Sequence, residues 1–206
     1  MLNKKFFNRD TLTVAKDLLG KTIIRNDNGI IYMAKIVETE AYLGIEDRAA
    51  HSFGDRKTER TKIMYEDAGT IYVYQTYGIH FMLNFVTKDR GVPEAVLIRG
   101  VEPLNEFDNI SKNRFGKTFD DLSTYQKKNL TNGPGKLTKA LNIDKNLNGK
   151  DLFGNELYLE EDDDRIFDVI VDKRIGIDYA KEAIDYPYRF YIKDNPYVSI
   201  LKKGLK

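Results

Sequence analysis

The chain has 206 residues, of which 41% are hydrophobic, and this size suits one domain, residues 1–206, with a core of its own. It has no cysteine and only two histidines, which excludes disulfides, thiol catalysis and zinc–thiolate sites and argues against a histidine-rich metal site. The formal net charge of +1, from 33 basic and 32 acidic residues, argues by itself against a nucleic-acid partner.

The first part of the sequence predicts a helix, a β-hairpin and a long loop. Apolar residues recur at helical spacing after Asp10, and Gly20 is well placed to end that helix. Residues 21–25 read as a strand, Asp27-Asn28-Gly29 is a hairpin signal, and a return strand runs from about residue 30 to 39. The polar stretch 48–67 then reads as a long loop.

The second part predicts further strands. Apolar and aromatic residues alternate over residues 69–87, which indicates two strands around a turn at Tyr77-Gly78. Residues 95–101 form a buried strand in this interpretation, and residues 188–192 form the last one. Because helices are few, the sequence favours a mixed α+β fold with a mainly antiparallel sheet.

Polar segments between these strands carry the remaining signals. Residues 105–129 predict surface helix and loop, and Gly133-Pro134-Gly135 precedes a short helix. Residues 160–164 are five consecutive acids, without which the formal net charge of the rest is +6, so one face can still be basic. Neither a signal peptide nor a membrane span is evident, so we expect a cytoplasmic protein with no membrane partner.

Two glutamates stand at the end of the predicted return strand, within VETEAYLGIEDRAAH. Side chains alternate faces along a strand, so Ile36, Glu38, Glu40 and Tyr42 are predicted to share one side. The simple interpretation is an edge strand whose polar face meets water. The alternative is a cleft floor that carries a catalytic acid, because a buried carboxylate needs a partner or a task.

Tyrosines mark the predicted hairpin at residues 69–87. Tyr72 and Tyr74 share a face, which fits ordinary cross-strand packing. Tyr77 lies at the turn beside Gly78, where a large aromatic side chain gains little from burial. An aromatic at such a tip can act as a wedge that is inserted into a partner.

Several blocks together resemble a known family. VETEAYLGIEDRAAHSFG, GTIYVYQTYGIHFMLN, AVLIRGVEPL and NGPGKLTKAL follow one another as in the alkyladenine (3-methyladenine) DNA glycosylases. The resemblance runs from FFNRDTLTVAKDLLGK to RIGIDYAKEAIDYPYRFYIKDNPYVSI and so covers nearly the whole chain. The family usually has asparagine after the arginine of its loop, where this chain has Arg60-Thr61.

The resemblance implies a single mixed α/β domain with a curved antiparallel sheet and a monofunctional DNA glycosylase activity. Such an enzyme flips an alkylated, or in some cases deaminated, purine out of double-stranded DNA and hydrolyses its N-glycosidic bond, leaving an abasic site. It implies a monomer that uses no metal and no cofactor. By position in the motif, Glu40 is the catalytic carboxylate that activates water, and Glu38 is structural or supporting.

The resemblance also assigns a base pocket. Tyr42 and His51 match two of the family's pocket residues, and Tyr74 matches the opposing aromatic. Asn84 matches the residue against the purine edge. N3- and N7-alkylated purines are cationic, and electron-rich rings favour them by roughly 0.5–2 kcal/mol for each cation–π contact. His51 fits equally well as a structural histidine. Which damaged purine is preferred stays open.

Four residues are expected to contact DNA in this resemblance. Tyr77 matches the wedge, and Arg99 matches a phosphate contact near the lesion. A structural ion pair is the alternative for Arg99, because it lies in the apolar stretch LIRGV and a buried arginine is costly unless paired. Arg56 and Lys136 are weaker phosphate candidates.

Two other functions remain compatible with the sequence. One is a non-catalytic nucleic-acid-binding β domain that keeps the aromatic face and the wedge. The other is a carbohydrate-active enzyme that uses Glu38 and Glu40 as a pair, since side chains two apart on one strand lie within about 7 Å.

Overall fold

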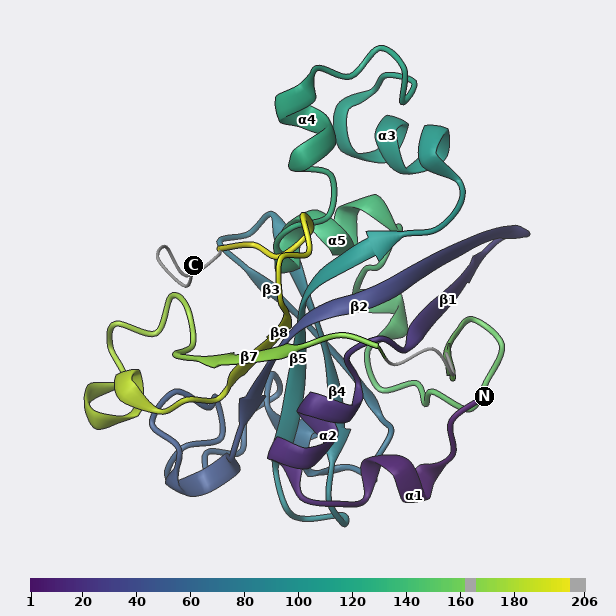
Figure 1. The fold of residues 1–206 in the computed structure, drawn as a ribbon. Helices are drawn as coiled ribbons and strands as arrows, with labels where there is room; N and C mark the ends of the chain where they lie inside the picture. Colours follow the sequence, from purple (N-terminus) through teal and green to yellow (C-terminus); the bar gives the residue numbers. More distant parts are fainter. Residues whose placement is uncertain (162–165, 201–206) are drawn as a thin grey trace.

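The fold is built around one long central strand, β2 (Ile30–Tyr42). The computed structural model describes residues 1–161 and 166–200. All strand pairs are antiparallel, in the order β3-β4-β5-β2-β1-β6, and β8 pairs with both β2 and β7 (Figure 1). The other strands are β1 (Thr22–Asp27), β3 (Ile71–Thr76), β4 (His80–Thr87), β5 (Glu94–Pro103), β6 (Leu157–Glu160), β7 (Val169–Asp172) and β8 (Arg189–Ile192).

The helices are short and lie around this open sheet. Helices α1 and α2 lie at one end of the molecule and α3 and α4 at the other, with α5 between the latter pair and the sheet (Figure 1). Their bounds are α1 (Lys4–Phe7), α2 (Thr11–Asp17), α3 (Phe107–Phe115), α4 (Thr124–Lys128) and α5 (Pro134–Ala140), with 3-10 turns at Gly44–Glu46, Lys62–Tyr65, Lys145–Leu147 and Lys181–Asp185. The predicted mixed α+β fold with an antiparallel sheet is confirmed. None of the helices in residues 1–161 and 166–200 is long and apolar enough to cross a lipid bilayer.

Apolar side chains of the helical segments and of the sheet form one main core. Phe7, Leu18 and Leu137 of the helical segments are fully buried together with Ile98 of β5. Asp10 caps α2 by accepting a hydrogen bond from the Thr13 amide, as expected for an aspartate at this position. Burial of the amphipathic helices against the sheet is the main source of stability in such a layered fold.

Both predicted hairpins are confirmed. Asn28 and Gly29 adopt φ values of 51° and 93° between β1 and β2, as a two-residue type I′ turn requires. Tyr77 and Gly78, with φ values of 50° and 70°, turn the chain between β3 and β4. The sequence reading missed α1, β6 and β7, and it ended the return strand three residues early. Of the acidic block 160–164, residues 162–164 lie outside the described residues.

The proposal of an edge strand with a wet polar face is wrong. At Glu38 and Glu40 the strand β2 lies between β5 and β8, so both of its edges are paired. Both glutamates are 0% exposed. A bulge beside Glu38 interrupts the regular alternation of side chains after Ile36. Beyond the bulge, Glu38, Glu40 and Tyr42 share one face, as the contacts that link them show.

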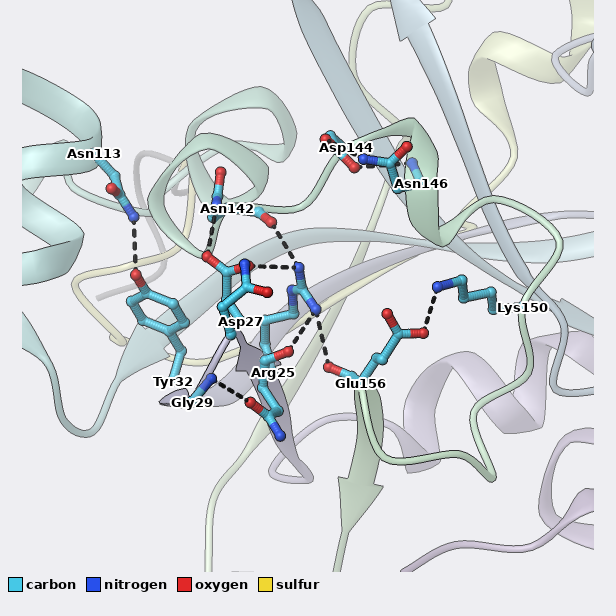
Figure 2. A network of polar contacts seen from close by, with 12 residues as sticks. Arg25, Asp27, Gly29, Tyr32, Asn113, Asn142, Asp144, Asn146, Lys150 and Glu156 are labelled. Carbon is cyan, nitrogen blue, oxygen red and sulfur yellow. Dashed lines mark hydrogen bonds and ion pairs between the residues drawn. The ribbon is translucent and has the colours of Figure 1, made fainter.

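A polar network fastens the β1–β2 hairpin to the rest of the fold. Figure 2 shows Arg25 at its centre, donating to Asp27 and to the backbone carbonyls of Asn142 and Glu156. The Tyr32 hydroxyl accepts a hydrogen bond of 3.2 Å from Asn113 of α3. This buried arginine is therefore paired, and the network holds the far end of β2 in register while its other end enters the candidate site.

Candidate active site

A cavity of about 330 Å³ opens where the end of β2 meets the β3–β4 hairpin. Its volume is at the lower end of the range for small-molecule pockets. Six of the nine sequence-predicted residues line it: Tyr42, His51, Tyr74, Tyr77, Asn84 and Arg99. The structure thus brings together residues that span almost sixty positions of sequence.

Glu40 lies directly behind the wall of this cavity. Its Oε1 accepts a hydrogen bond of 2.7 Å from the Ile175 amide, and its Oε2 accepts one of 2.8 Å from the Tyr42 hydroxyl. The Arg99 guanidinium lies 3.4 Å from the same Oε2. All three partners line the cavity. A fully buried carboxylate is thereby held at the cavity by three donors.

Glu38 has different surroundings. It accepts hydrogen bonds from Arg189 of β8 at 2.6 Å and from the amide and hydroxyl of Ser199 at 2.8 and 2.9 Å. Arg99 Nε lies 3.4 Å from Glu38 Oε1, so one guanidinium bridges the two glutamates. Burial lowers the pKa of Arg99, but the carboxylates of Glu40 and Glu38 more than offset this and raise it above its usual value.

A second buried ion pair supports the floor of the site. Arg174, which is 5% exposed, makes two hydrogen bonds to the Asp47 carboxylate, at 2.5 and 2.8 Å, and one to the Ala41 carbonyl. Its guanidinium also lies 4.8 Å from the ring centre of Tyr42. Because Ile175 follows it directly, this pair fixes the amide that binds Glu40. Sequence reasoning missed Asp47 and Arg174, although both lie inside the matched motif blocks.

Aromatic rings form one wall of the cavity. The rings of His51 and Tyr74 meet edge to face at 4.6 Å, and His51 Nδ1 lies 3.1 Å from the Tyr72 hydroxyl. Burial, and secondly the charge of Arg60, lowers the pKa of His51 to about 4, so its ring is neutral at pH 7. Burial likewise raises the pKa of Tyr72 to about 12, which keeps that hydroxyl protonated.

The Tyr42 phenol stays protonated too, because burial and the neighbouring Glu40 raise its pKa well above its ordinary value. Asn84 is 4% exposed, and its Nδ2 donates to the carbonyls of Tyr72 and Met82. These two bonds fix the orientation of the Asn84 amide at the cavity wall.

Tyr77 stands at the tip of the β3–β4 hairpin with 89% of its surface exposed. Its neighbour Ile79 is 71% exposed. Because Tyr77 also lines the cavity, an exposed aromatic tip adjoins the pocket mouth. This confirms the predicted position of Tyr77 at a turn outside the core.

The three candidate phosphate contacts have different surroundings. Arg99 is 8% exposed and lies between the two glutamates. Lys136 donates to Asn129 and Asn132, which ties α5 to the end of α4. Arg56 is exposed and lines a neighbouring cavity of about 510 Å³ instead of the aromatic pocket.

No cluster of three or more metal-ligating side chains occurs within residues 1–161 and 166–200. A wider groove of about 720 Å³ lies elsewhere, beside β6, and it contains none of the predicted site residues. Its charged side chains are largely paired with one another, as in Lys4–Asp67 and Lys150–Glu156. Of these two cavities, only the aromatic one is therefore lined by predicted site residues.

An aromatic-walled cavity over a buried carboxylate suits an enzyme that takes up a planar base. Over residues 5–196 the chain matches the family model described as Methylpurine-DNA glycosylase (MPG), and it belongs to that family.

Curated relatives agree with this membership. A protein of Clostridium novyi (strain NT) is 57% identical over 96% of this chain and 98% of its own length. Relatives from Clostridium perfringens (strain SM101) and Desulfitobacterium hafniense (strain Y51) are 51% and 50% identical, over 96% and 97% of this chain and 98% of theirs. Each of the three carries the name "Putative 3-methyladenine DNA glycosylase".

Proposed function

We propose that this protein is a DNA repair glycosylase that flips alkylated purines out of duplex DNA and hydrolyses their N-glycosidic bond with a water activated by Glu40. The observation that carries the proposal is the position of Glu40. Its carboxylate is fully buried, and each of its three donors, Tyr42, Arg99 and Ile175, lines the aromatic cavity.

The hydrogen bonds of Glu40 leave acceptor capacity for a water molecule. A carboxylate has about four lone-pair directions, and within residues 1–161 and 166–200 Glu40 Oε1 accepts a hydrogen bond only from the Ile175 amide. In the reaction the C1′–N bond breaks and its electron pair leaves with the purine, so the sugar becomes oxocarbenium-like. The water oxygen then bonds to C1′ and its proton passes to Glu40. The negative carboxylate also stabilises the cationic sugar.

The aromatic wall supplies the base-binding surface. Tyr42 would cover one face of the flipped base, and His51 and Tyr74, which are in contact with each other, the other face. Stacking on such rings holds a planar base. Asn84, anchored through its amide nitrogen, meets the edge of the base.

Tyr77 explains how a duplex could be a substrate. Its exposed ring at the hairpin tip can fill the gap that a flipped nucleotide leaves in the stack. Arg56, Lys136 and the small exposed part of Arg99 are the proposed phosphate contacts of this duplex.

Two features argue against the other candidate functions. Glu38 is held by Arg189 and Ser199, neither of which lines the cavity, so the two glutamates do not act as an exposed pair in a sugar site. In a non-catalytic binding domain Glu40 would be incidental, and the fact that all three of its donors line the aromatic cavity would have no function.

The decisive experiment is the release of free base. Purified protein is incubated with methylated duplex DNA and the released bases are identified by mass spectrometry, with the Glu40→Gln variant as the matched control. We expect the native protein, and not the Glu40→Gln variant, to release alkylated purines. Equal release by the two proteins, or none by the native one, would contradict the proposal.

A further inference from the structure

An arginine from the 48–67 loop enters the aromatic cavity. The Arg60 guanidinium carbon lies 4.6 Å from the ring centre of Tyr74, and its Nη2 lies 3.3 Å from His51 Nε2. Arg60 lines the cavity of about 330 Å³, and this volume is what remains with the guanidinium in that position. A fixed positive charge therefore sits at the wall against which the base would stack.

Arg60 differs in charge balance from the other arginines of the site. Arg99 is paired with Glu38 and Glu40, and Arg174 with Asp47. Within residues 1–161 and 166–200, Arg60 has no carboxylate at ion-pair distance, and its neighbours are the rings of Tyr74 and His51. Its charge is thus not compensated inside the pocket.

The contact with His51 also determines which nitrogen of that ring carries the proton. Because Arg60 can only donate, His51 Nε2 must accept, so Nδ1–H donates to the Tyr72 hydroxyl at 3.1 Å. The pKa of His51, lowered to about 4 by burial and then by Arg60, agrees with this neutral form. Arg60 is consequently the positive group among these three side chains.

We propose that Arg60 is a specificity-determining residue that selects among damaged purines by charge, opposing cationic N-alkylated purines relative to neutral ones. The inference rests on the proposed glycosylase function. The guanidinium already interacts with the π face of Tyr74, which weakens the attraction of that ring for a second cation. Like charges at this range repel, whereas a neutral deaminated or bridged purine meets no such opposition.

The neighbouring loop arginine provides a matched control. Arg56 lies four positions earlier on the same loop and is exposed like Arg60. It lines the adjacent cavity of about 510 Å³ but not the aromatic pocket, whereas Arg60 lines both. Removing Arg56 therefore takes away the same formal charge without changing the wall against which the base stacks.

The test compares single-turnover excision from duplexes that contain either 7-methylguanine, a cation, or hypoxanthine, which is neutral. In Arg60→Gln we expect the ratio of the two rates to rise in favour of the cation by about fivefold, the factor for removing one like-charge contact at about 4 Å that is screened as in bulk water, because Arg60 is exposed. Arg60→Lys should leave the ratio near the native value. Arg56→Gln should slow both reactions by the same factor.

An unchanged ratio in Arg60→Gln, or an equal change in Arg56→Gln, would overturn the inference while leaving the glycosylase function intact. Absence of excision from every duplex would instead refute the proposed function, and this inference with it.

A second measurement does not depend on activity. With only two histidines in the chain, NMR can follow the His51 titration in the free protein. Loss of the Arg60 charge should raise the pKa of His51 in Arg60→Gln and not in Arg56→Gln. A His51 pKa that does not move would show that Arg60 is not beside this ring in solution, which also overturns the inference.

Discussion

Exchanging each buried glutamate for glutamine should separate chemistry from stability. Three donors point at Glu40, and a glutamine amide has only one oxygen to accept from them. If its NH2 faces Tyr42, that hydroxyl can rotate to accept, but Arg99 Nη1 loses its acceptor, although the guanidinium keeps Glu38 as an ionic partner. One unsatisfied buried donor costs about 1–2 kcal/mol. For a chain of this size that lowers Tm by about 2–8 °C. Loss of the general base should slow excision by about 10²–10⁴-fold.

Glu38→Gln should lower the stability more than Glu40→Gln does and slow excision less. It removes the charge opposite Arg189, which is 2% exposed, and breaking a buried pair costs about 3–5 kcal/mol. The lower figure applies, because Asp172 also lies 3.5 Å from Arg189. Tm should fall by about 6–12 °C. Excision per folded molecule should stay within about tenfold of the native rate, since the general base is kept.

The assay pairs single-turnover excision with thermal melting, at a temperature where both variants are folded. Lesion binding, measured on the same duplex, should be retained in Glu40→Gln because binding depends on the rings and phosphate contacts. The reasoning is refuted if Glu40→Gln excises at near the native rate while Glu38→Gln abolishes turnover. In that case the catalytic carboxylate would be the one that faces Arg189 and Ser199.

Four further outcomes are expected. Tyr77→Ala should impair excision from duplex much more than from single-stranded DNA, with nearly unchanged Tm, because Tyr77 is 89% exposed. DNA affinity should fall with salt at a slope in log–log terms of roughly −0.9 per contacted phosphate, and a flat response would exclude duplex binding. Excision should survive excess EDTA; loss restored only by zinc or magnesium would contradict a carboxylate–water mechanism. His51 has its pKa lowered to about 4 from 6.5, so the unfolded chain binds its proton first as pH falls. Its stabilising contribution, present above pH 6.5, should fade by about 3 kcal/mol towards pH 4, and in chemical denaturation His51→Gln should lack that part of the pH dependence.

Local signals in the sequence were sufficient for the hairpins and for most strands. Asn28, Gly29 and Gly78 adopt the positive φ values that their residue types favour, so turn chemistry, with the alternation of the flanking strands, located both turns. Tyr77, at a φ of 50°, adopts a conformation that bulky side chains seldom take. The strands β6 and β7 have four residues each, too few for alternation to be distinguished from chance. They exist because they pair with β1 and β8, a tertiary effect that local patterns do not contain.

Local patterns in the sequence also predicted part of the candidate site. Alternation along β2 correctly placed Glu38, Glu40 and Tyr42 on one face. The groups that complete the site come from far along the chain. Arg174 pairs with a carboxylate 127 positions earlier, and nothing in the neighbourhood of Arg60 in sequence shows that its guanidinium lies over Tyr74.

The difference between the two glutamates shows why motif and structure are both needed. Glu38 and Glu40 lie one strand repeat apart, are equally buried and share Arg99, so no local property distinguishes them. Their remaining partners do. Arg189 and Ser199 hold Glu38 in the protein interior, away from the cavity. Glu40 is instead held by groups that themselves form the cavity wall, so of the two carboxylates it is the one that adjoins the space proposed for the base.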